Sequence, residues 1–272
     1  MPVLVVGAGV VGLSVALAVQ ARGLDVTVYD REGPAAGASA GNAGGLAFPE
    51  VHPLASPGLI ARAPGWLLDP LGPLSIPPRY APRIAPWLIR LAAASTPARV
   101  RASTRAQAAL MEASRAALLR LVDRLDLGGM ITKAGQLQLY ESARSFEAAR
   151  HEWETRAALG IEHRMLAREE IAQYQPGLSD RFTHAVFSPG WWGVRDPKAY
   201  TLALARSFTA AGGRLARTEV TRLTPTGLVT ADGPVEGTVV LAAGAHSHLL
   251  ARTLGVAIPL EALAKTMFGK RA

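Results

Sequence analysis

The sequence predicts an α/β fold organised around a parallel sheet. An apolar, β-branched run, VLVV at 3–6, is typical of a central parallel strand buried on both faces. The glycine pattern GAGVVG at 7–12 follows where the chain turns into a helix, and the apolar run DVTVYD at 25–30 closes on an acid, Asp30. Strand, glycine-rich turn, helix, second strand and acid in this order predict a Rossmann-type dinucleotide-binding domain.

The three glycines have separate roles in such a turn. Gly7 permits the tight turn after the strand, Gly9 lets a pyrophosphate approach the backbone, and Gly12 lets the helix pack on the strand. The N–H groups of Val10, Val11 and Gly12 lie at the positive end of the helix dipole, which stabilises an anion. We predict that these five residues bind the cofactor's phosphates.

The helix predicted over 10–22 places Leu13, Leu17 and Ala21 on one face. Two other interpretations of this apolar run fit less well. A signal peptide requires a basic segment before its apolar core, and nothing basic precedes the run. A transmembrane helix requires about 20 apolar residues, whereas glycines interrupt this run and polar residues follow early.

Asp30 lies 18 residues after Gly12, where the ribose 2′-hydroxyl of a dinucleotide requires an acceptor. Its negative charge would repel a 2′-phosphate. Arg31, beside it, is a candidate to bind such a phosphate; the alternatives are a surface position and one beside the adenine. Both residues are therefore candidates for the cofactor site.

The segment 31–50 is rich in Gly, Ala, Ser and Asn, and almost no bulky side chain precedes Leu46. Such a loop offers backbone N–H groups and small surfaces to a flat, polar group. The alternative is a loop that is merely flexible. Its candidate cofactor-binding residues are Ser39, Asn42, Ala43, Gly44 and Gly45.

The composition narrows the function classes. Of the 272 residues, 49% are apolar and 18% charged, which indicates a globular chain. The absence of cysteine excludes disulfides, thiolate metal sites and thiol nucleophiles, and it fits a reducing, cytoplasmic compartment. The net charge of +8 comes mainly from arginine, but no dense basic run interleaves with aromatics, so we expect no nucleic-acid partner. A solvated arginine-rich surface and a basic face at the inner surface of the membrane both remain open.

The middle of the chain alternates between irregular and regular patterns. Residues 51–86 are rich in proline and predict extended, irregular chain. Residues 99–125 predict a helix, with an apolar line at Ala106, Leu110, Ala113, Ala117, Leu121 and Leu125 and arginines on the opposite side. Strand-like runs at 135–140 and 184–188 flank a predicted helix near 143–159 and suggest a second sheet. Apolar side chains at Trp66, Leu67, Leu68, Trp87, Leu88 and Ile89 fit either packing inside a domain or a membrane or partner contact.

The C-terminal part returns to α/β patterning. Asp196 and Pro197 predict an N-cap followed by proline in the first helical turn. That helix runs to Gly212–Gly213 with Tyr200, Leu204 and Phe208 spaced by four, and a returning strand follows over 214–223. A buried strand within 237–247 ends in Ala243 and Gly244, whose small size permits close approach of a dinucleotide. His246 and His248 follow; they lack a third metal partner, so a helix start or a place near the cofactor are the alternatives.

Several segments together resemble the FAD-dependent amino-acid oxidoreductases of the D-amino-acid oxidase and glycine oxidase type, most closely the bacterial D-amino acid dehydrogenase small subunits. They are VVGAGVVGLSVALAVQARGLDVTVYDRE, SAGNAGGL, HPLASPG, WLLDPLGPLSIPPRY, WLIRLAAASTPARVRASTRA, GQLQLYES, QPGLSDRFTHAVFSPGWWGVRDP and TVVLAAGAHSHLL, in that order, and the resemblance extends from residue 2 to about 260. The resemblance implies FAD as cofactor. It also implies that backbone groups near Val220 meet the adenine side.

The resemblance implies a Rossmann-type FAD-binding domain of 1–50 and 195–272, with an inserted, incomplete α+β substrate domain in 51–194. The implied activity is oxidative deamination of D-amino acids to 2-oxo acids and ammonia by hydride transfer to the flavin. Electrons then pass to a quinone-type acceptor. No acid/base pair stands out, so no catalytic residue is nominated, and no metal is expected.

The resemblance weakens at the C-terminal end. After the counterpart of GVAIPLE at 255–261, the family continues with further substrate-domain strands and a last glycine-rich flavin segment. This sequence ends in ALAKTMFGKRA, so we expect a truncated or frame-shifted member, or one part of a split protein with a complementing C-terminal chain. The alternatives to an active enzyme are a catalytically silent flavin- or nucleotide-binding remnant and an NAD-dependent dehydrogenase.

Overall fold

The computed structural model describes residues 1–57, 79 and 81–260. The chain divides into two compact units, which we describe separately. Unit 1 comprises residues 1–44, 122–131 and 194–272, and unit 2 comprises residues 45–121 and 132–193. The domain boundaries expected from the sequence remain a prediction; these units differ from them mainly by placing 122–131 in unit 1.

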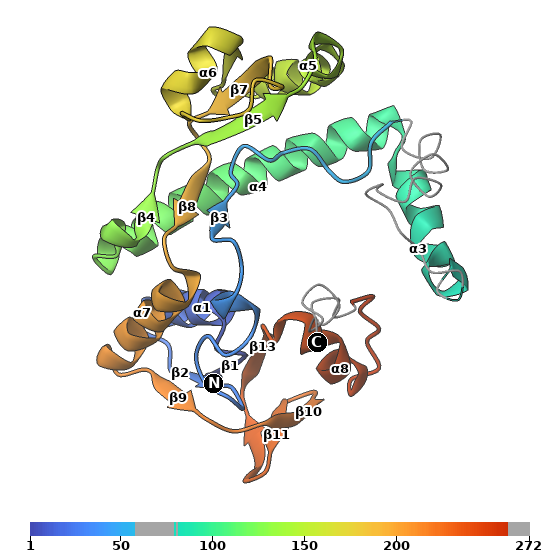
Figure 1. Ribbon diagram of the computed structural model, residues 1–272. Coiled ribbons are helices and arrows are strands. Elements are labelled where there is room, and N and C mark those ends of the chain that lie inside the picture. Colours follow the sequence, from blue (N-terminus) through green and yellow to red (C-terminus); the bar gives the residue numbers. More distant parts are fainter. Residues whose placement is uncertain (58–78, 80, 261–272) are drawn as a thin grey trace, which may run out of the picture. The chain divides into compact units, whose positions relative to one another are not determined.

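Unit 1 is built on a four-stranded parallel sheet of order β13-β1-β2-β9 (Figure 1). Its strands are β1 (Val3–Val6), β2 (Val26–Tyr29), β9 (Arg214–Ala216) and β13 (Thr238–Leu241). All four residues of β1 are buried, which confirms the prediction of a central strand from the run VLVV. The α/β class predicted from the sequence is therefore confirmed.

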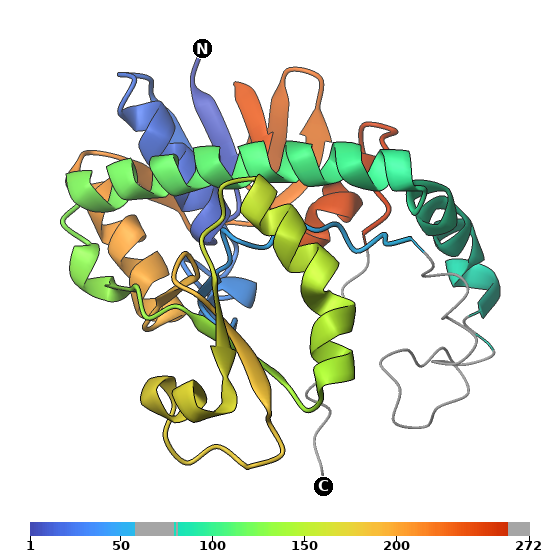
Figure 2. The same cartoon turned by 90° about the horizontal axis from the view of Figure 1, so that it is seen from above.

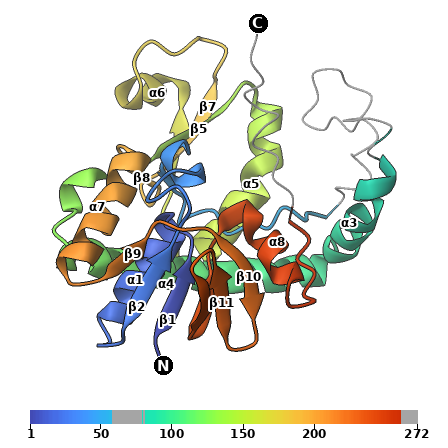
Figure 3. The same ribbon diagram turned by 90° about the horizontal axis from the view of Figure 1, so that it is seen from below.

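Two helices of unit 1 pack side by side, α1 (Val10–Gln20) and α7 (Pro197–Ala210) (Figure 3). In α1, Leu13 and Leu17 are buried as predicted, but Ala21 is the exposed C-cap residue, because the helix ends at Gln20. In α7, the Asp196 carboxylate accepts the Ala199 N–H at 2.9 Å, which confirms the predicted N-cap. The predicted inward residues of α7 are all buried: Tyr200, Leu204 and Phe208.

The single strand predicted over 214–223 is wrong. The structure has two strands there: β9 joins the parallel sheet, and β10 (Val220–Thr224) starts an antiparallel sheet with β11 (Gly227–Thr230) and β12 (Gly233–Glu236). The chain changes sheets because the apolar residues of the second sheet form a core with β1 and β2. That core contains Leu4, Val6, Tyr29, Val220, Leu223 and Leu228. A short helix, α8 (Ser247–Arg252), follows β13.

Unit 2 contains one small sheet and most of another, whose residues Ile131 and Val194 belong to unit 1; this confirms the prediction of a second sheet. The strands of the first sheet are coloured green to yellow in Figure 2. The first has the order β5-β7-β6, with β5 (Gln136–Tyr140), β6 (Arg164–Ala167) and β7 (His184–Ser188) all antiparallel. The other has the order β3-β8-β4, with β3 (Gly45–Leu46), β4 (Ile131–Thr132) and β8 (Trp192–Val194). Helices α5 (Ala143–Ala158) and α6 (Arg168–Tyr174) accompany the first sheet.

The long helix α4 (Pro97–Arg124) confirms the helix predicted over 99–125, but the predicted inward face is wrong. Along the predicted apolar line, Leu110 is 63% exposed and Ala106, Ala113 and Ala117 are also exposed. Thr104 and Val122 are buried instead. A polar residue can lie on the inward side because it has a partner there: the Gln107 amide donates to the Glu50 carbonyl at 3.1 Å.

A second helix, α3 (Ala81–Ala94), precedes α4 and begins inside the segment predicted as irregular. Proline is tolerated in the first turn of a helix, where the N–H group has no helical partner, but Pro86 lies in the interior. The predictions for Trp66, Leu67 and Leu68 lie outside the described residues. Trp87 and Ile89, in α3, are 45% and 69% exposed.

Candidate dinucleotide-binding site

The turn between β1 and α1 requires glycine at two positions. Gly7 has φ +110°, and a Cβ there would collide with the Ala242 carbonyl oxygen, at the end of the neighbouring strand β13. A Cβ on Gly12 would collide with the Gly7 carbonyl oxygen. Because both contacts are with backbone, no side chain can be accommodated without separating α1 from the sheet. The structure thus gives a packing reason for the first and third glycines of the pattern.

Gly9 lies close to Ser39, in the loop that follows β2. An ideal Cβ on Gly9 would lie 3.0 Å from the Ser39 hydroxyl oxygen, and that oxygen accepts the Val10 N–H at 2.9 Å. Ser39 belongs to a short 3₁₀ turn, η1 (Ala38–Ala40). The loop therefore reaches the N-terminus of α1, where the helix dipole and the free N–H groups favour an anion.

Asp30 organises the end of β2. One carboxylate oxygen accepts the Ala8 N–H at 2.9 Å, and the other accepts the N–H groups of Glu32 and Gly33, both at 2.9 Å. An ionised carboxylate has about four acceptor sites. Within the described residues three of these sites are used, so one is left on the oxygen that binds Ala8, which suits a ribose hydroxyl.

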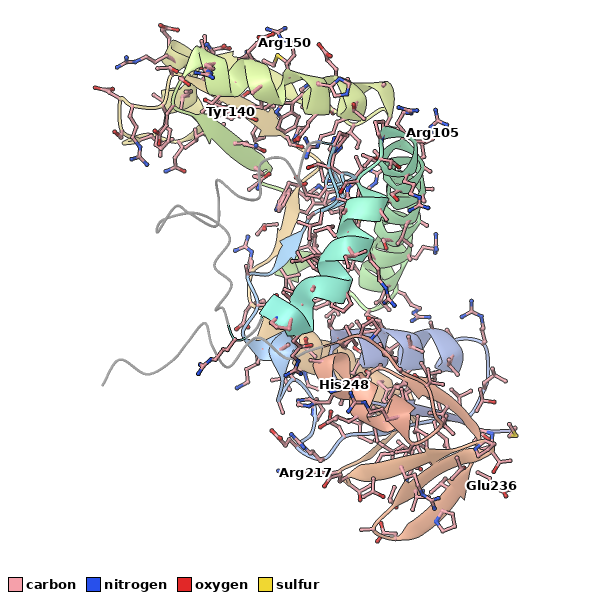
Figure 4. The ribbon with its side chains drawn as sticks, turned by 90° about the vertical axis from the view of Figure 1, so that its right-hand side faces the viewer. Arg105, Tyr140, Arg150, Arg217, Glu236 and His248 are labelled. Carbon is pink, nitrogen blue, oxygen red and sulfur yellow. The ribbon has the colours of Figure 1, made fainter. Side chains whose placement is uncertain are left out.

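A cavity of about 150 Å³ opens beside Asp30. Val28, Pro34 and Leu215 supply apolar surface, whereas Asp30 and Arg217 supply opposite charges. The complete lining is Ala8, Val28, Asp30, Glu32, Gly33, Pro34, Leu215, Ala216 and Arg217. Apolar walls with a few placed polar groups are typical of small-molecule sites. Arg217 directly follows β9 and is labelled in Figure 4.

Sequence reasoning missed the residues that β9 brings to this cavity, Leu215, Ala216 and Arg217. No local motif marks them. Their position follows from the sheet order, in which β9 pairs in parallel with β2, so that both strands end at the same edge. The general rule that ligands bind at the carboxyl ends of parallel strands is the one signal that points to them.

The glycine-rich loop has hydrogen bonds of its own, which argue against a merely flexible segment. The Asn42 amide oxygen accepts the Gly44 N–H at 2.8 Å, and its nitrogen donates to the Ala38 and Ser39 carbonyls at 3.3 Å. Gly44 has φ +68°, and a Cβ there would lie 2.5 Å from the Val194 carbonyl oxygen. Ala43 lies between these residues in the chain.

Other predicted residues lie apart from the cavity lining. Arg31 is exposed. Its guanidinium lies 3.0 Å from the Glu32 carboxylate (Nε to Oε1) and 4.0 Å from the Glu219 carboxylate (Nη1 to Oε1). The Val220 side chain is buried in the core under the antiparallel sheet. Gly45 begins β3 and faces Gly193 of β8. Their roles in cofactor binding remain predictions.

The end of β13 lies at the turn. The Ala243 Cα is 3.1 Å from the position of a Cβ on Gly7, and Gly244, with φ +56°, starts the 3₁₀ turn η4 (Gly244–His246). His246 is the N-cap residue of α8, which confirms the helix-start interpretation, and His248 Nδ1 lies 2.6 Å from the Ala245 carbonyl. Among the described residues no group of three metal-ligating side chains occurs.

These features fit a dinucleotide. The turn admits no side chain at Gly7 or Gly12, the helix N-terminus lies beside it, and a carboxylate with one free acceptor site lines a cavity of mixed polarity. Fold and site together define a Rossmann-type dinucleotide-binding protein.

The family follows from comparison with known proteins. The model of the DAO family, described as FAD dependent oxidoreductase, matches residues 2–268. The chain belongs to this family of FAD-dependent oxidoreductases, whose cofactor is FAD.

Curated relatives share about a third of its residues. A D-amino-acid oxidase of Bradyrhizobium diazoefficiens is 34% identical over 95% of this chain and 63% of its own length. A D-amino acid dehydrogenase of Rhizobium johnstonii is 30% identical over 96% of this chain and 65% of its own length. This chain therefore spans slightly less than two thirds of the length of these relatives.

Solved structures share the fold. Glycine oxidase from Geobacillus kaustophilus superposes with a TM-score of 0.68 at 21% identity, over 94% of this chain and 58% of that chain. L-proline dehydrogenase from P. horikoshii gives a TM-score of 0.63 at 18% identity, over 94% and 56% of the two chains. At this level of identity the similarity establishes the fold alone.

Proposed function

We propose that this chain is an FAD-dependent oxidoreductase that oxidises D-amino acids to 2-oxo acids and ammonia. The observation that supports it most strongly is the match of nearly the whole chain to a D-amino-acid oxidase at 34% identity. A quinone-type electron acceptor, rather than oxygen, is part of the proposal, by analogy with the relatives named as dehydrogenases.

In this proposal the residues of unit 1 hold the cofactor by its adenosine and diphosphate end. The Gly7–Gly12 turn and the N-terminus of α1 bind the pyrophosphate. The free acceptor site of Asp30 binds a ribose hydroxyl, and the cavity beside it receives the adenine-side group. The small residues of the loop, which the hydrogen bond from Gly44 N–H to Asn42 holds in place, face the flavin side in this proposal.

The bound FAD supplies the acceptor for the two electrons of the amine's α C–H bond. The chain's own contribution is to orient the cofactor. Ser39 fixes the loop against the helix N-terminus, and Asp30 fixes the end of β2 through three backbone N–H groups. The imino acid that leaves then hydrolyses with water to the 2-oxo acid and ammonia.

A second candidate, a silent FAD-binding part that a complementing chain must complete, is favoured by the edge of the sheet. In the described part of the chain β13 pairs only with β1. Its residues TVVL are about as apolar as VLVV of β1, yet they are partly or fully exposed, whereas those of β1 are buried. An apolar edge without charge or proline can accept another strand.

The visible spectrum of the purified chain tests both candidates. We expect a yellow protein, because flavin is retained, and bleaching when D-alanine or D-proline is added without oxygen. Retained flavin without bleaching would favour the second candidate. Adding the C-terminal third of the Bradyrhizobium diazoefficiens relative should then restore bleaching. A colourless, folded protein that binds NAD would contradict both.

A further inference from the structure

A second cavity belongs wholly to unit 2. Its volume is about 240 Å³, larger than that of the cavity beside Asp30, and the two cavities share no lining residue. Apolar side chains supply most of its wall, which consists of Phe48, Val51, Ala108, Met111, Glu112, Leu159, Gly160 and Ile161. All of these residues lie in unit 2, so the cavity is complete within one compact unit.

Three segments form the wall: the chain that follows β3, the middle of α4 and the end of α5. The chain after β3 runs along α4 (Figures 1 and 2), and the Gln107 amide of α4 donates to the Glu50 carbonyl at 3.1 Å. The Arg156 guanidinium of α5 donates to the Pro49 carbonyl at 3.2 Å and to the Glu50 carboxylate at 3.1 Å. One short segment, Pro49–Glu50, is therefore bonded to both helices.

These bonds hold the walls at a fixed spacing. The Arg156 side chain is only 5% exposed, and moving it away from Glu50 would leave a buried charge without its partner, which is strongly destabilising. The Phe48 ring packs edge-on against Trp192, with 5.5 Å between the ring centroids. The cavity cannot close by a shift of α5 or of Phe48 without the loss of these contacts, so it belongs to the folded unit.

The charge of the lining indicates an uncharged ligand. Among the described lining residues Glu112 is the one that ionises, and Arg115 already donates to both of its carboxylate oxygens, at 3.0 and 2.9 Å. The two side chains are 66% and 43% exposed, so this pair lies where the cavity meets water. A charged ligand that entered would lose its water without finding a free opposite charge, which costs free energy.

We propose that this cavity binds a compact, uncharged aromatic molecule of the size of indole. An apolar protein cavity of about 150 Å³ is large enough to bind benzene, so about 240 Å³ leaves room for a larger ring system. The Phe48 ring and the Met111 thioether both make favourable contacts with an aromatic ring. This proposal depends neither on FAD binding nor on the amino acid that is oxidised.

Titration of the full chain with indole tests the proposal, with NMR detection of methionine methyl groups labelled with carbon-13. We expect a saturable shift of the Met111 methyl signal, assigned with the M111L variant, because Met111 lines the cavity. The signal of Met165, which is 38% exposed on β6, should not move. The shift should be the same with and without bound FAD, and the flavin absorption should not change. A flavin change without a Met111 shift would place indole elsewhere and overturn the proposal.

A pair of neighbouring substitutions provides the matched control. Ala108→Leu fills the cavity and should weaken indole binding about tenfold or more, whereas Ala109→Leu, at the next and exposed residue of α4, should leave the affinity unchanged. Equal affinities of the two variants would overturn the proposal.

The unaltered chain offers a test that needs no variant. Tryptamine and indole-3-acetate carry the same ring with a positive and a negative charge, and both should bind much more weakly than indole. Binding of either as tightly as indole, or no saturable shift of Met111 with indole, would refute the assignment.

Discussion

Replacing Asp30 by alanine tests the interpretation of the cofactor site most directly. The substitution removes the acceptor of three backbone N–H groups. Ala8 is 1% exposed, so its N–H group cannot bond to water instead, and leaving it without an acceptor destabilises the folded state by about 1–3 kcal/mol. The Gly33 N–H is partly buried and adds about 1 kcal/mol, while Glu32 is exposed and adds little. We expect the free energy of unfolding to fall by about 2–4 kcal/mol.

The same variant should weaken FAD binding. Loss of one hydrogen bond from a ribose hydroxyl to a carboxylate costs about 1.5–3 kcal/mol, or roughly 10- to 150-fold in Kd. Urea unfolding of the apoprotein and flavin fluorescence titration separate the two effects. Asp25→Ala is the control, since Asp25 is an exposed acid at the other end of β2. If D30A matched D25A in both measurements, Asp30 would not organise the site and our reasoning would fail.

Three further substitutions test the packing. Gly12→Ala should cost about 1–3 kcal/mol of stability and most FAD affinity, because its Cβ collides with the Gly7 carbonyl; thermal unfolding with and without FAD measures this. Tyr140→Phe should cost about 1–3 kcal/mol, because the buried Trp153 indole N–H, now 2.8 Å from the phenol oxygen, loses its acceptor. Burial raises the pKa of Tyr140 above its usual 10.0. The neutral phenol therefore contributes fully to the free energy of unfolding below about pH 10, and this contribution falls as the pH rises further. In urea titrations the free energy of unfolding of Y140F should fall less at alkaline pH than that of the unaltered chain. Tyr200→Phe should instead raise stability by up to about 1 kcal/mol, since its buried hydroxyl has no hydrogen-bond partner among the described residues, and a loss in the same titration would contradict this.

The features that the sequence predicted correctly are those determined by residues close together in the sequence. The glycine turn, the N-cap at Asp196 and the buried run VLVV depend on local geometry, and each lies where the pattern placed it. The inward face of α4 could not be predicted, because its Gln107 bonds to the Glu50 carbonyl, 57 residues away. A polar side chain with a distant partner looks like a surface residue in the sequence.

The cavity lining shows the same limit. Leu215 and Asp30 are adjacent only because β9 pairs with β2. The apolar residues of a strand do not determine which other strand it pairs with. The strand predicted over 214–223 failed for a related reason. Both halves of that run favour a strand, and only the core formed by Val220 and Leu223 against β1 decides that the second half joins another sheet.

The distribution of the site along the chain has an experimental consequence. The glycine turn, Asp30, the loop residue Ser39 and the cavity residues from β9 all belong to unit 1. In the described part of the chain, the hydrogen bonds of Asp30 and Ser39 and the close contacts of Gly7 and Gly12 join residues of unit 1 to one another. If FAD binds as proposed, its adenosine and diphosphate end is therefore held by unit 1. Affinity for FAD and oxidation of an amino acid should therefore be separable. Variants in the turn should lose both together, whereas a chain that lacks part of its substrate side should keep the flavin and lose only the reaction.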